Sequence, residues 1–365
     1  MSSAQTQIPI ARPQLGEEEE AAVIEVMRSG MLAQGARVKA FEESFARAMG
    51  ARYAVATSNG TTALYLALLA HGIGPGDDVI TSPLTFIATA NAIVHTGARP
   101  TFADVDDSLN LDPRAAAAMI GSRTTAIVPV HLHGSPCDVA ALARLADASG
   151  LVMIQDACQA VGATVDGQPL GAFGTAVYSF YATKNLTTGE GGMIITNDAA
   201  VAEVAASLRH QAYSSSAYVH NAVAYNFRMT EMQAAIGLVQ LQKLGALTQR
   251  RRDTARYFDQ TIPSDRLRRP RVNAGASHVY HQYTLRVQPW ERLSRDAIRR
   301  RLERDGIGTG IYYPLPVHKQ PPYLHLDNPP CPEAERAADD MFSVPVHPGL
   351  SDEDRGRVAQ AIAAL

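Results

Sequence analysis

The stretch Ser179-Phe-Tyr-Ala-Thr-Lys184-Asn-Leu-Thr-Thr-Gly189-Glu-Gly-Gly192 is a small polar loop between two apolar runs. The runs 176–180 and 193–196 have the composition of strand interiors. A lysine is ordinarily a solvated surface residue, because burying an unpaired ammonium is costly. Lys184 lies where the chain leaves one such strand and enters the next. This position predicts a desolvated amine that loses its proton and attacks a carbonyl.

A carboxylate, Asp156, ends the apolar run 151–155 upstream of the lysine. At the carboxyl end of a buried strand, it is expected to face the crevice in which open α/β sheets bind ligands. If the ligand is pyridoxal phosphate, Asp156 would keep the pyridine nitrogen protonated, so that the ring accepts electrons from a developing carbanion. The lysine and the carboxylate together therefore point to this cofactor.

A phosphate cradle is predicted where the short strand 54–57 runs through Ser-Asn-Gly60-Thr61-Thr62 into an apolar helix. Gly60 permits close approach, and the N–H groups of Thr61 and Thr62 are expected to be free at a helix end whose dipole favours an anion. Ser179 could add a hydroxyl. The alternative, given equal weight, is an ordinary strand-to-helix turn with a Ser/Asn cap.

Phe86 begins another expected helix, after the strand 79–81. An aromatic ring at this place could stack on a planar cofactor. A simple role in the core is the favoured alternative for a phenylalanine at a helix start.

Together these residues resemble the DegT/DnrJ/EryC1/StrS family, the pyridoxal-phosphate sugar aminotransferases with the aspartate aminotransferase fold (fold type I). The resemblance extends from Gly30 to Leu350. The matching motifs are Ser58-Asn-Gly-Thr-Thr-Ala63, Thr85-Phe-Ile-Ala-Thr89, Asp156-Ala-Cys-Gln159-Ala, Ser179-Phe-Tyr-Ala-Thr-Lys184 with Gly189-Glu-Gly-Gly192, Tyr225-Asn226-Phe-Arg228-Met-Thr-Glu-Met-Gln233 and Tyr312-Tyr-Pro-Leu-Pro-Val-His318-Lys-Gln320.

The resemblance implies that Lys184 and Asp156 are the catalytic residues, the first bonded to the cofactor and the second paired with its pyridine nitrogen. The remaining cofactor contacts that it implies are Phe86 for ring stacking, Gln159 for the ring hydroxyl, and Gly60, Thr61 and Ser179 for the phosphate. In this family the asparagine that matches Asn226 reaches the cofactor phosphate of the neighbouring subunit, which implies a homodimer with shared sites.

The substrate residues expected from the sequence are fewer. Arg228 is a candidate for a carboxylate or substrate phosphate, since a guanidinium fork suits such groups; an interface ion pair is the equally weighted alternative. By resemblance, Tyr312, Tyr313 and His318 could line the substrate side of the cleft between domains.

Three positions depart from the family pattern. Gln155 stands where many members carry Glu, Ala224 where Gly is usual, and Gln211 where Gly is common. None of them removes a chemical group that the chemistry needs, although they weaken any inference about the substrate.

The resemblance implies a two-stage transamination. L-Glutamate would give its amino group to the cofactor and leave as 2-oxoglutarate. The resulting pyridoxamine phosphate would aminate a nucleotide-linked keto-sugar, which is an intermediate on the way to a deoxyaminosugar.

The sequence leaves other functions open. Within the family, a keto-cyclitol aminotransferase or a pyridoxamine-phosphate sugar dehydratase is an alternative, and Lys184 argues against the dehydratase. A non-catalytic sensor or regulator is a third, which the intact Lys184, Asp156 and Asn226 oppose. The glycines of 72–76 are similar to a dinucleotide-binding motif, which would indicate an oxidoreductase. That motif follows a strand, however, whereas these glycines precede one.

Composition agrees with a two-domain enzyme. The chain has 365 residues, of which 46% are hydrophobic, and a net charge of −3. This length predicts two domains. The net charge is not the strongly positive one that is typical of nucleic-acid-binding proteins. Three widely spaced cysteines lack metal-ligand spacing and fit a reducing cytoplasm. No basic leader and no apolar run of about 18 residues is present, so neither secretion nor a membrane span is expected.

The alternation along the chain predicts an α/β fold: a large domain with a mostly parallel seven-stranded sheet wrapped by helices, and a smaller C-terminal α+β domain. The expected strands are 53–57, 79–82, 101–105, 125–130, 151–155, 176–180 and 193–196, with the last two antiparallel because they are too close for a crossover. We expect residues 1–38 to pack on the small domain, 39–245 to form the large domain and 246–365 the small one. A long helix from about residue 230 should connect the two, and the arginines of 250–252 and 299–301 should form solvated helix faces.

Overall fold

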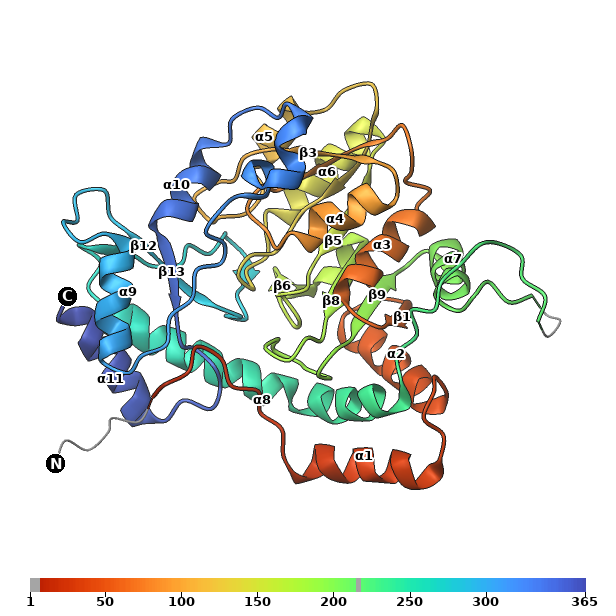
Figure 1. Ribbon diagram of the computed structural model, residues 1–365, viewed down its shortest axis with the longest axis horizontal. Helices are drawn as coiled ribbons and strands as arrows, with labels where there is room; N and C mark the ends of the chain where they lie inside the picture. Colours follow the sequence, from red (N-terminus) through yellow and green to blue (C-terminus); the bar gives the residue numbers. More distant parts are fainter. Residues whose placement is uncertain (1–6, 215–217) are drawn as a thin grey trace.

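A seven-stranded sheet forms the centre of the molecule in the computed structural model, which describes residues 7–214 and 218–365 (Figure 1). Its strand order is β1-β9-β8-β5-β4-β2-β3. The strands are β1 (Tyr53–Thr57), β2 (Asp78–Thr81), β3 (Arg99–Phe102), β4 (Thr124–Val128), β5 (Val152–Asp156), β8 (Thr175–Ser179) and β9 (Gly192–Thr196). β9 runs antiparallel to both β8 and β1, whereas the other neighbours are parallel. The predicted seven strands and the antiparallel final pair are confirmed.

Helices cover both faces of this sheet, which explains why every residue of β2, β8 and β9 is buried. They are α2 (Ala36–Ala48), α3 (Gly60–Ala70), α4 (Ala88–His95), α5 (Pro113–Ala118), α6 (Val139–Ser149) and α7 (Ala199–Arg209). Successive side chains of β2 enter opposite cores, since strand side chains alternate. Ile80 lies in the core that contains Phe45 of α2, and Val79 in the core that contains Leu66 of α3. The carboxyl ends of the parallel strands thus meet at one edge, where loops can build a site.

The helix α8 (Glu231–Thr261) joins two hydrophobic cores. Thr230 caps it, accepting the N–H of Gln233, so the helix begins where the sequence predicts. Leu244 belongs to the core of the large sheet, and Ala255 and Phe258 belong to a second core. At 1.5 Å per residue a helix of this length spans about 45 Å, and Figure 1 shows it running beneath both parts.

The second core lies between a small antiparallel sheet and two helices. The elements are β10 (Leu267–Arg268), β12 (Tyr283–Val287), β13 (Met341–Val344), α9 (Arg295–Arg304) and α11 (Asp352–Ala363). Tyr283, Leu285 and Phe342 are its largest buried members from the strands.

Part of the C-terminal third returns to the large sheet. The elements η2 (Val317–Lys319), η3 (Pro321–Leu326) and α10 (Pro332–Asp340) pack near β3, with Val317 and Tyr323 against Leu84 and Phe102. Likewise β11 (Ala276–Ser277) pairs with the hairpin β6 (Thr164–Val165) and β7 (Gln168–Pro169), which η1 (Leu170–Phe173) follows. Chain segments from both sides of α8 therefore meet above the sheet edge that carries the site.

The N-terminal segment contacts both parts. Ile8 pairs with Ile307 next to the small sheet, and α1 (Glu17–Ser29) lies along α8, where Lys243 and Gln240 donate to the buried Glu19. The acidic residues 17–20 form the first turn of α1, as predicted. Of the segment 1–38 expected on the small domain, residues 1–6 lie outside the described residues.

The prediction that the arginines of 250–252 form a solvated helix face is wrong for Arg251. Its side chain is buried because its guanidinium reaches the carbonyls of Tyr280 and His281. Arg300 and Arg301 of the second cluster are exposed, as expected. Within residues 7–214 and 218–365, no helix is long and apolar enough to cross a membrane.

Candidate active site

Lys184 lies in the loop between β8 and β9, close to the carboxyl end of β5. The loop is held in place because Asn185 donates to the carbonyl of Val279 at 2.8 Å and Thr187 donates back to Phe180. The lysine is half-buried, and its Nζ has no hydrogen bond or ion pair with any described residue. Burial lowers the pKa of this amine, and the neighbouring Cys158 and Asp156 oppose the shift without cancelling it. The predicted desolvated amine is therefore supported.

Asp156 is the last residue of β5 and is 5% exposed. Oδ2 accepts a hydrogen bond from Thr89 Oγ1 at 2.7 Å, and Oδ1 accepts the N–H of Cys158 at 3.1 Å. Thr85 lies 2.9 Å from the hydroxyl of Thr89, which extends the chain of hydrogen bonds. Thr89 belongs to the motif Thr85-Phe-Ile-Ala-Thr89, and its place one turn after Phe86 is the signal in the sequence for its position in the site.

The phosphate cradle forms where α3 meets β8. A Cβ atom on Gly60 would lie 2.8 Å from Cβ of Ser179 and 3.1 Å from Sγ of Cys158, so only glycine permits this approach. Thr61 follows in the first helical turn, where N–H groups have no partner within the helix. The expectation of a free N–H on Thr62 is wrong, because Asn59 Oδ1 caps it at 2.9 Å. The turn is thus both capped and shaped to admit an anion.

An aromatic side chain and an amide complete the site. Phe86 is 56% exposed, so the alternative of a core role is wrong, and its ring centroid lies 5.9 Å from that of Tyr313. Gln159 donates through Nε2 to the hydroxyl of Tyr313 at 3.2 Å, whereas its buried Oε1 has no partner among the described residues. Burial, together with the charge of Asp156, raises the pKa of Tyr313.

These residues fit pyridoxal phosphate. An amine with a lowered pKa, a doubly hydrogen-bonded carboxylate, a glycine-walled helix end and an exposed aromatic ring lie on adjacent elements. The orphaned Oε1 of Gln159 is a buried acceptor that calls for a donor such as a ring hydroxyl. No group of acidic, histidine or cysteine side chains able to hold a metal ion occurs in the described ranges.

Tyr312 lies beside Tyr313, with ring centroids 6.1 Å apart, and its carbonyl is held by a residue that the sequence did not single out. His133 is 4% exposed, and its Nε2 lies 2.8 Å from the carbonyl of Tyr312. Burial lowers the pKa of His133 to about 4, so the ring is neutral and donates this hydrogen bond.

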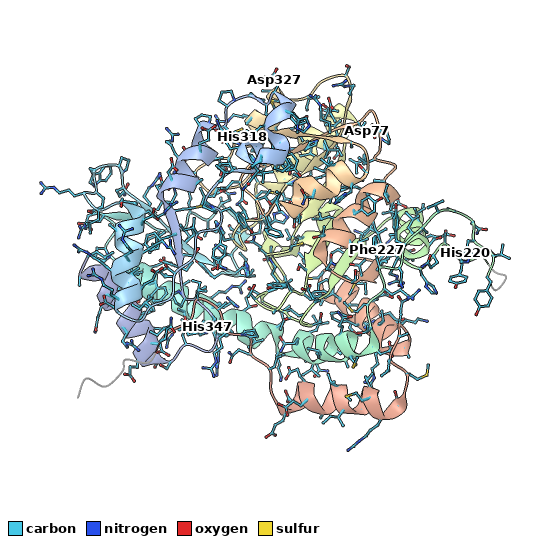
Figure 2. The ribbon with its side chains drawn as sticks, viewed as in Figure 1. Asp77, His220, Phe227, His318, Asp327 and His347 are labelled. Carbon is cyan, nitrogen blue, oxygen red and sulfur yellow. The ribbon has the colours of Figure 1, made fainter. Side chains whose placement is uncertain are left out.

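His318 does not face an open cleft. It is 6% exposed, its Nε2 lies 3.1 Å from Glu335 Oε1, and its ring packs beside Phe102. Figure 2 shows it at the top of the view, close to α10. The expectation that His318 lines the substrate side of the cleft is therefore corrected: its burial in the packing of α10 and η2 gives it a structural role.

Asn226 and Arg228 lie on the segment that leads into α8. Asn226 is exposed and pairs by its backbone with His210. Arg228 donates to His210 Nδ1 at 2.5 Å and is half-buried, and it makes no ion pair with the described residues. Phe227, between them, accepts the N–H of Ser58 at 2.8 Å, which ties this segment to the cradle.

Comparison with protein families matches residues 13–363 to the DegT/DnrJ/EryC1/StrS aminotransferase family. The chain belongs to this family. It is 42% identical over 347 residues to a protein named pleiotropic regulatory protein from Geobacillus stearothermophilus, covering 93% of this chain and 92% of the relative. It is 39% identical to the GDP-perosamine synthase of Caulobacter vibrioides, covering 97% of each.

Its fold is similar to that of the aminotransferase TlmJ from Streptoalloteichus hindustanus, with a TM-score of 0.92, 37% identity and 98% coverage of both chains. The protein is thus an aminotransferase with fold type I, as the sequence resemblance implied. Aminotransferases of this family depend on pyridoxal phosphate.

Proposed function

We propose that this aminotransferase transfers the amino group of L-glutamate to a nucleotide-linked keto-sugar, with pyridoxal phosphate held at Lys184. The observation that carries the proposal is the meeting of Lys184, with its lowered pKa, and the hydrogen-bonded Asp156 beside the Gly60–Ser179 cradle. When bound, the cofactor supplies an aldehyde for an amine and a ring that accepts electrons. Similarity to a GDP-perosamine synthase supports a nucleotide sugar as acceptor.

The residues of the chain supply positioning and proton transfer. Lys184 is neutral in a larger fraction of molecules than a solvated lysine, which suits it to attack a carbonyl and later to take the proton from the α-carbon of the donor. Asp156 would hold positive charge at the ring nitrogen, since both its oxygens accept hydrogen bonds as an ionised carboxylate does. Ser179, Gly60 and Thr61 would hold the phosphate, Phe86 would stack on the ring, and Gln159 would contact its hydroxyl.

A homodimer with shared sites is part of the proposal. Asn226 is exposed and its side chain has no partner among the described residues, as expected of a group that reaches a neighbouring subunit. Exposed apolar side chains on and after α1 support an interface; they are Ile24, Met27, Met31 and Leu32. Arg228, two residues from Asn226, is free of acidic partners within the described chain and remains a candidate for a substrate phosphate.

The acceptor is tested by supplying L-glutamate and keto-sugars linked to GDP, UDP or dTDP, and detecting the aminated product by mass spectrometry. We expect one or more of these nucleotide sugars to be aminated and the free keto-sugar to react much more slowly. Equal reaction of a keto-cyclitol would overturn the sugar-nucleotide assignment.

A second candidate, a non-catalytic regulator, is favoured by one observation, the name of the Geobacillus relative. The presence of Lys184, Asp156 and the Gly60–Ser179 cradle argues against a non-catalytic role. A Lys184→Ala protein that retains its full effect in the cell would favour the regulator.

A further inference from the structure

Three arginines are buried within residues 7–214 and 218–365, and one of them lacks a counter-ion. Arg209 and Arg251 are 6% exposed, and Arg286 is 5% exposed. Arg209 is paired with Glu42, and Arg286 with two carboxylates, one of them that of Asp340. In the part of the chain that the structure describes, Arg251 has no acidic partner. Because burying an unpaired charge is costly, the burial of Arg251 without a carboxylate needs an explanation.

The hydrogen bonds of Arg251 satisfy only part of its guanidinium. Nη1 donates to the carbonyls of Tyr280 at 3.1 Å and His281 at 3.4 Å. Nε is buried and has no partner within the described residues. Burial lowers the pKa of Arg251 to about 10, since no carboxylate offsets the lost hydration. The side chain therefore has an unmet capacity to bind an anion.

Arg251 lines a small hollow together with Lys184. Arg12 of the N-terminal segment stands at the same hollow and is exposed. The other lining residues are neutral: Pro13, Gln14, Thr183, Asn185, Thr187, Gln240, Leu247 and Pro348. The hollow has room for about one water-sized group, so a carboxylate enters only when side chains that line it move. Two guanidinium groups and no carboxylate thus line a space next to the reactive amine.

We propose that Arg251, with Arg12 at the rim, binds the α-carboxylate of the amino donor. This inference rests on the proposed function. The carboxylate of an amino acid is bonded to the carbon that carries the reacting amine, so its receptor must lie close to Lys184. The diphosphate of a nucleotide sugar is several bonds from the keto carbon, and a nucleoside is far too large for the hollow. A guanidinium offers a carboxylate two parallel N–H donors.

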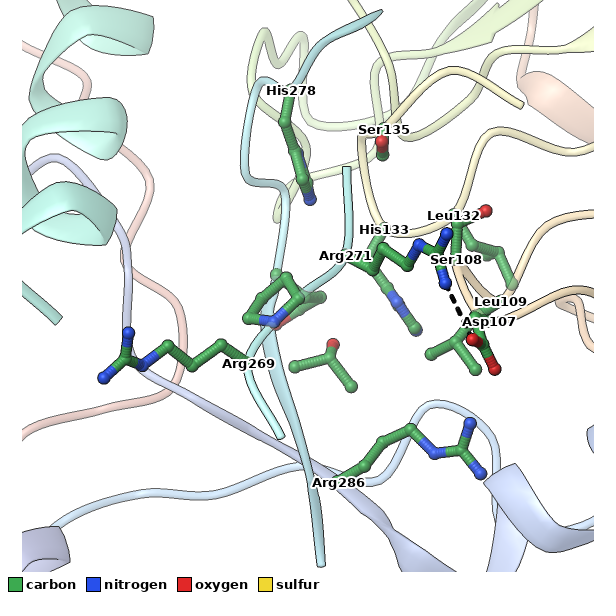
Figure 3. Close-up of a pocket in the computed structure, with 13 residues that line it drawn as sticks. Asp107, Ser108, Leu109, Leu132, His133, Ser135, Arg269, Arg271, His278 and Arg286 are labelled. Atoms are coloured by element: carbon green, nitrogen blue, oxygen red, sulfur yellow. Dashed lines mark hydrogen bonds and ion pairs between the residues drawn. The ribbon is translucent and has the colours of Figure 1, made fainter. Parts of the chain in front are cut away.

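A second hollow, lined by Arg269, Arg271, Arg286, His133 and His278, does not carry such an inference (Figure 3). Arg271 is paired with Asp107 at 2.7 Å, and Arg286 with its two carboxylates. Cationic side chains that already hold counter-ions offer less to an anionic ligand.

The direct test is calorimetric titration of the holoenzyme with maleate, a dicarboxylate that has no amine to transfer. Arg251→Gln removes a charged hydrogen-bond donor from the proposed site. It should therefore weaken maleate binding roughly 10- to 100-fold. Arg252→Gln is the matched control: Arg252 bonds to Ser277 and His278, just before the two carbonyls that Arg251 reaches, but it does not line the hollow. Its effect should stay below about threefold. Unchanged maleate affinity in Arg251→Gln overturns the proposal.

A second measurement separates binding from a structural role. The donor half-reaction is followed by absorbance with L-glutamate and with 4-aminobutyrate, which lacks the α-carboxylate. In Arg251→Gln, the preference for L-glutamate over 4-aminobutyrate should fall at least tenfold, whereas a merely structural role would slow both donors alike and so contradict the proposal. Arg12→Gln, at an exposed position that does not endanger folding, should lower the same preference by a smaller factor. An unchanged preference in both variants overturns the carboxylate site.

The proposed amino donor and the proposed carboxylate site at Arg251 can be refuted separately. If wild-type holoenzyme does not react with L-glutamate, the proposed amino donor is wrong, and the maleate titration still decides whether Arg251 binds a carboxylate. If the wild type reacts and Arg251→Gln keeps the donor preference, only the carboxylate site is wrong.

Discussion

Thr89 Oγ1 donates a hydrogen bond of 2.7 Å to Oδ2 of Asp156. Both residues are almost fully buried, at 1% and 5% exposure, and the hydroxyl belongs to the first turns of α4 while the carboxylate ends β5. This bond fixes the orientation of the carboxylate that the proposed function pairs with the cofactor ring. A group that must hold a proton on a ring nitrogen benefits from being held in place before the cofactor arrives.

Removing this bond should slow proton transfer. Thr89→Val keeps the shape of the side chain and deletes a hydrogen bond to a charged group, worth about 1.5–3 kcal/mol. We expect the half-reaction with L-glutamate to slow by roughly 10- to 100-fold, measured by stopped-flow absorbance. Thr85→Val, which removes the neighbouring hydroxyl without touching Asp156, should cost much less. Equal rates for Thr89→Val and wild type would remove the positioning role.

Gly60 should not tolerate a methyl group. In Gly60→Ala the new Cβ would lie 2.8 Å from Ser179, so α3 or β8 must shift, at a cost of about 1–3 kcal/mol. Affinity for pyridoxal phosphate should fall at least tenfold in a titration of the apoprotein. Gly245→Ala is the control, because the position lies in α8 with no atom near the added carbon. A normal cofactor affinity in Gly60→Ala would show that the cradle lies elsewhere.

Asn226 supplies a test of the shared sites. Asn226→Ala subunits mixed with Lys184→Ala subunits form hybrid dimers in which one site carries both defects and the other carries neither. We expect the mixture to recover activity that neither variant has alone, up to about half that of wild type in each hybrid. Activity equal to the sum of the two separate variants would contradict a contact across the dimer.

Acid should destabilise the protein partly through His131. Burial lowers its pKa to about 4, against 6.5 in the unfolded chain, so between these pH values only the unfolded chain binds the proton. Its contribution to stability is therefore complete above pH 6.5 and is lost as the pH falls toward 4, by about 1.4 kcal/mol per pH unit.

Gln155, one of the three positions that depart from the family pattern, controls this effect. Gln155 Oε1 lies 3.3 Å from His131 Nε2, and the N–H of Cys137 donates to Nδ1, so the ring is neutral. Gln155→Glu would place a carboxylate opposite the ring and raise the pKa of His131. Urea unfolding at pH 5 and pH 7 should then differ by about 1–2 kcal/mol less than in wild type. Gln155→Met should leave the difference unchanged; an unchanged difference in Gln155→Glu would refute the account.

The sequence predicted the large sheet well because its strands carry local signals. The runs that became β2, β5 and β8 contain consecutive apolar residues, as is typical of strands covered on both faces. The site followed from the same pattern, since Asp156 and Lys184 stand at strand ends. Gln211 also has a local explanation: its φ of 60° is the left-handed conformation in which glycine is common.

Contacts between distant segments had no such signal. The burial of Arg251 depends on carbonyls about 30 residues later in the chain, and His318 is buried because α10 folds back over it. Likewise nothing near Phe86 in the sequence shows that its ring is exposed beside Tyr313. Residue types predicted the chemistry, whereas tertiary packing decided which of those residues reach the site.

The central claim is that Lys184 holds the cofactor that accepts the amino group. It is tested by recording the visible absorption spectrum of the purified protein before and after L-glutamate, and by reducing the coloured form with borohydride and mapping the labelled peptide. We predict a band that L-glutamate bleaches and a label on Lys184. A protein that stays colourless after incubation with pyridoxal phosphate, or a label on another lysine, would contradict it.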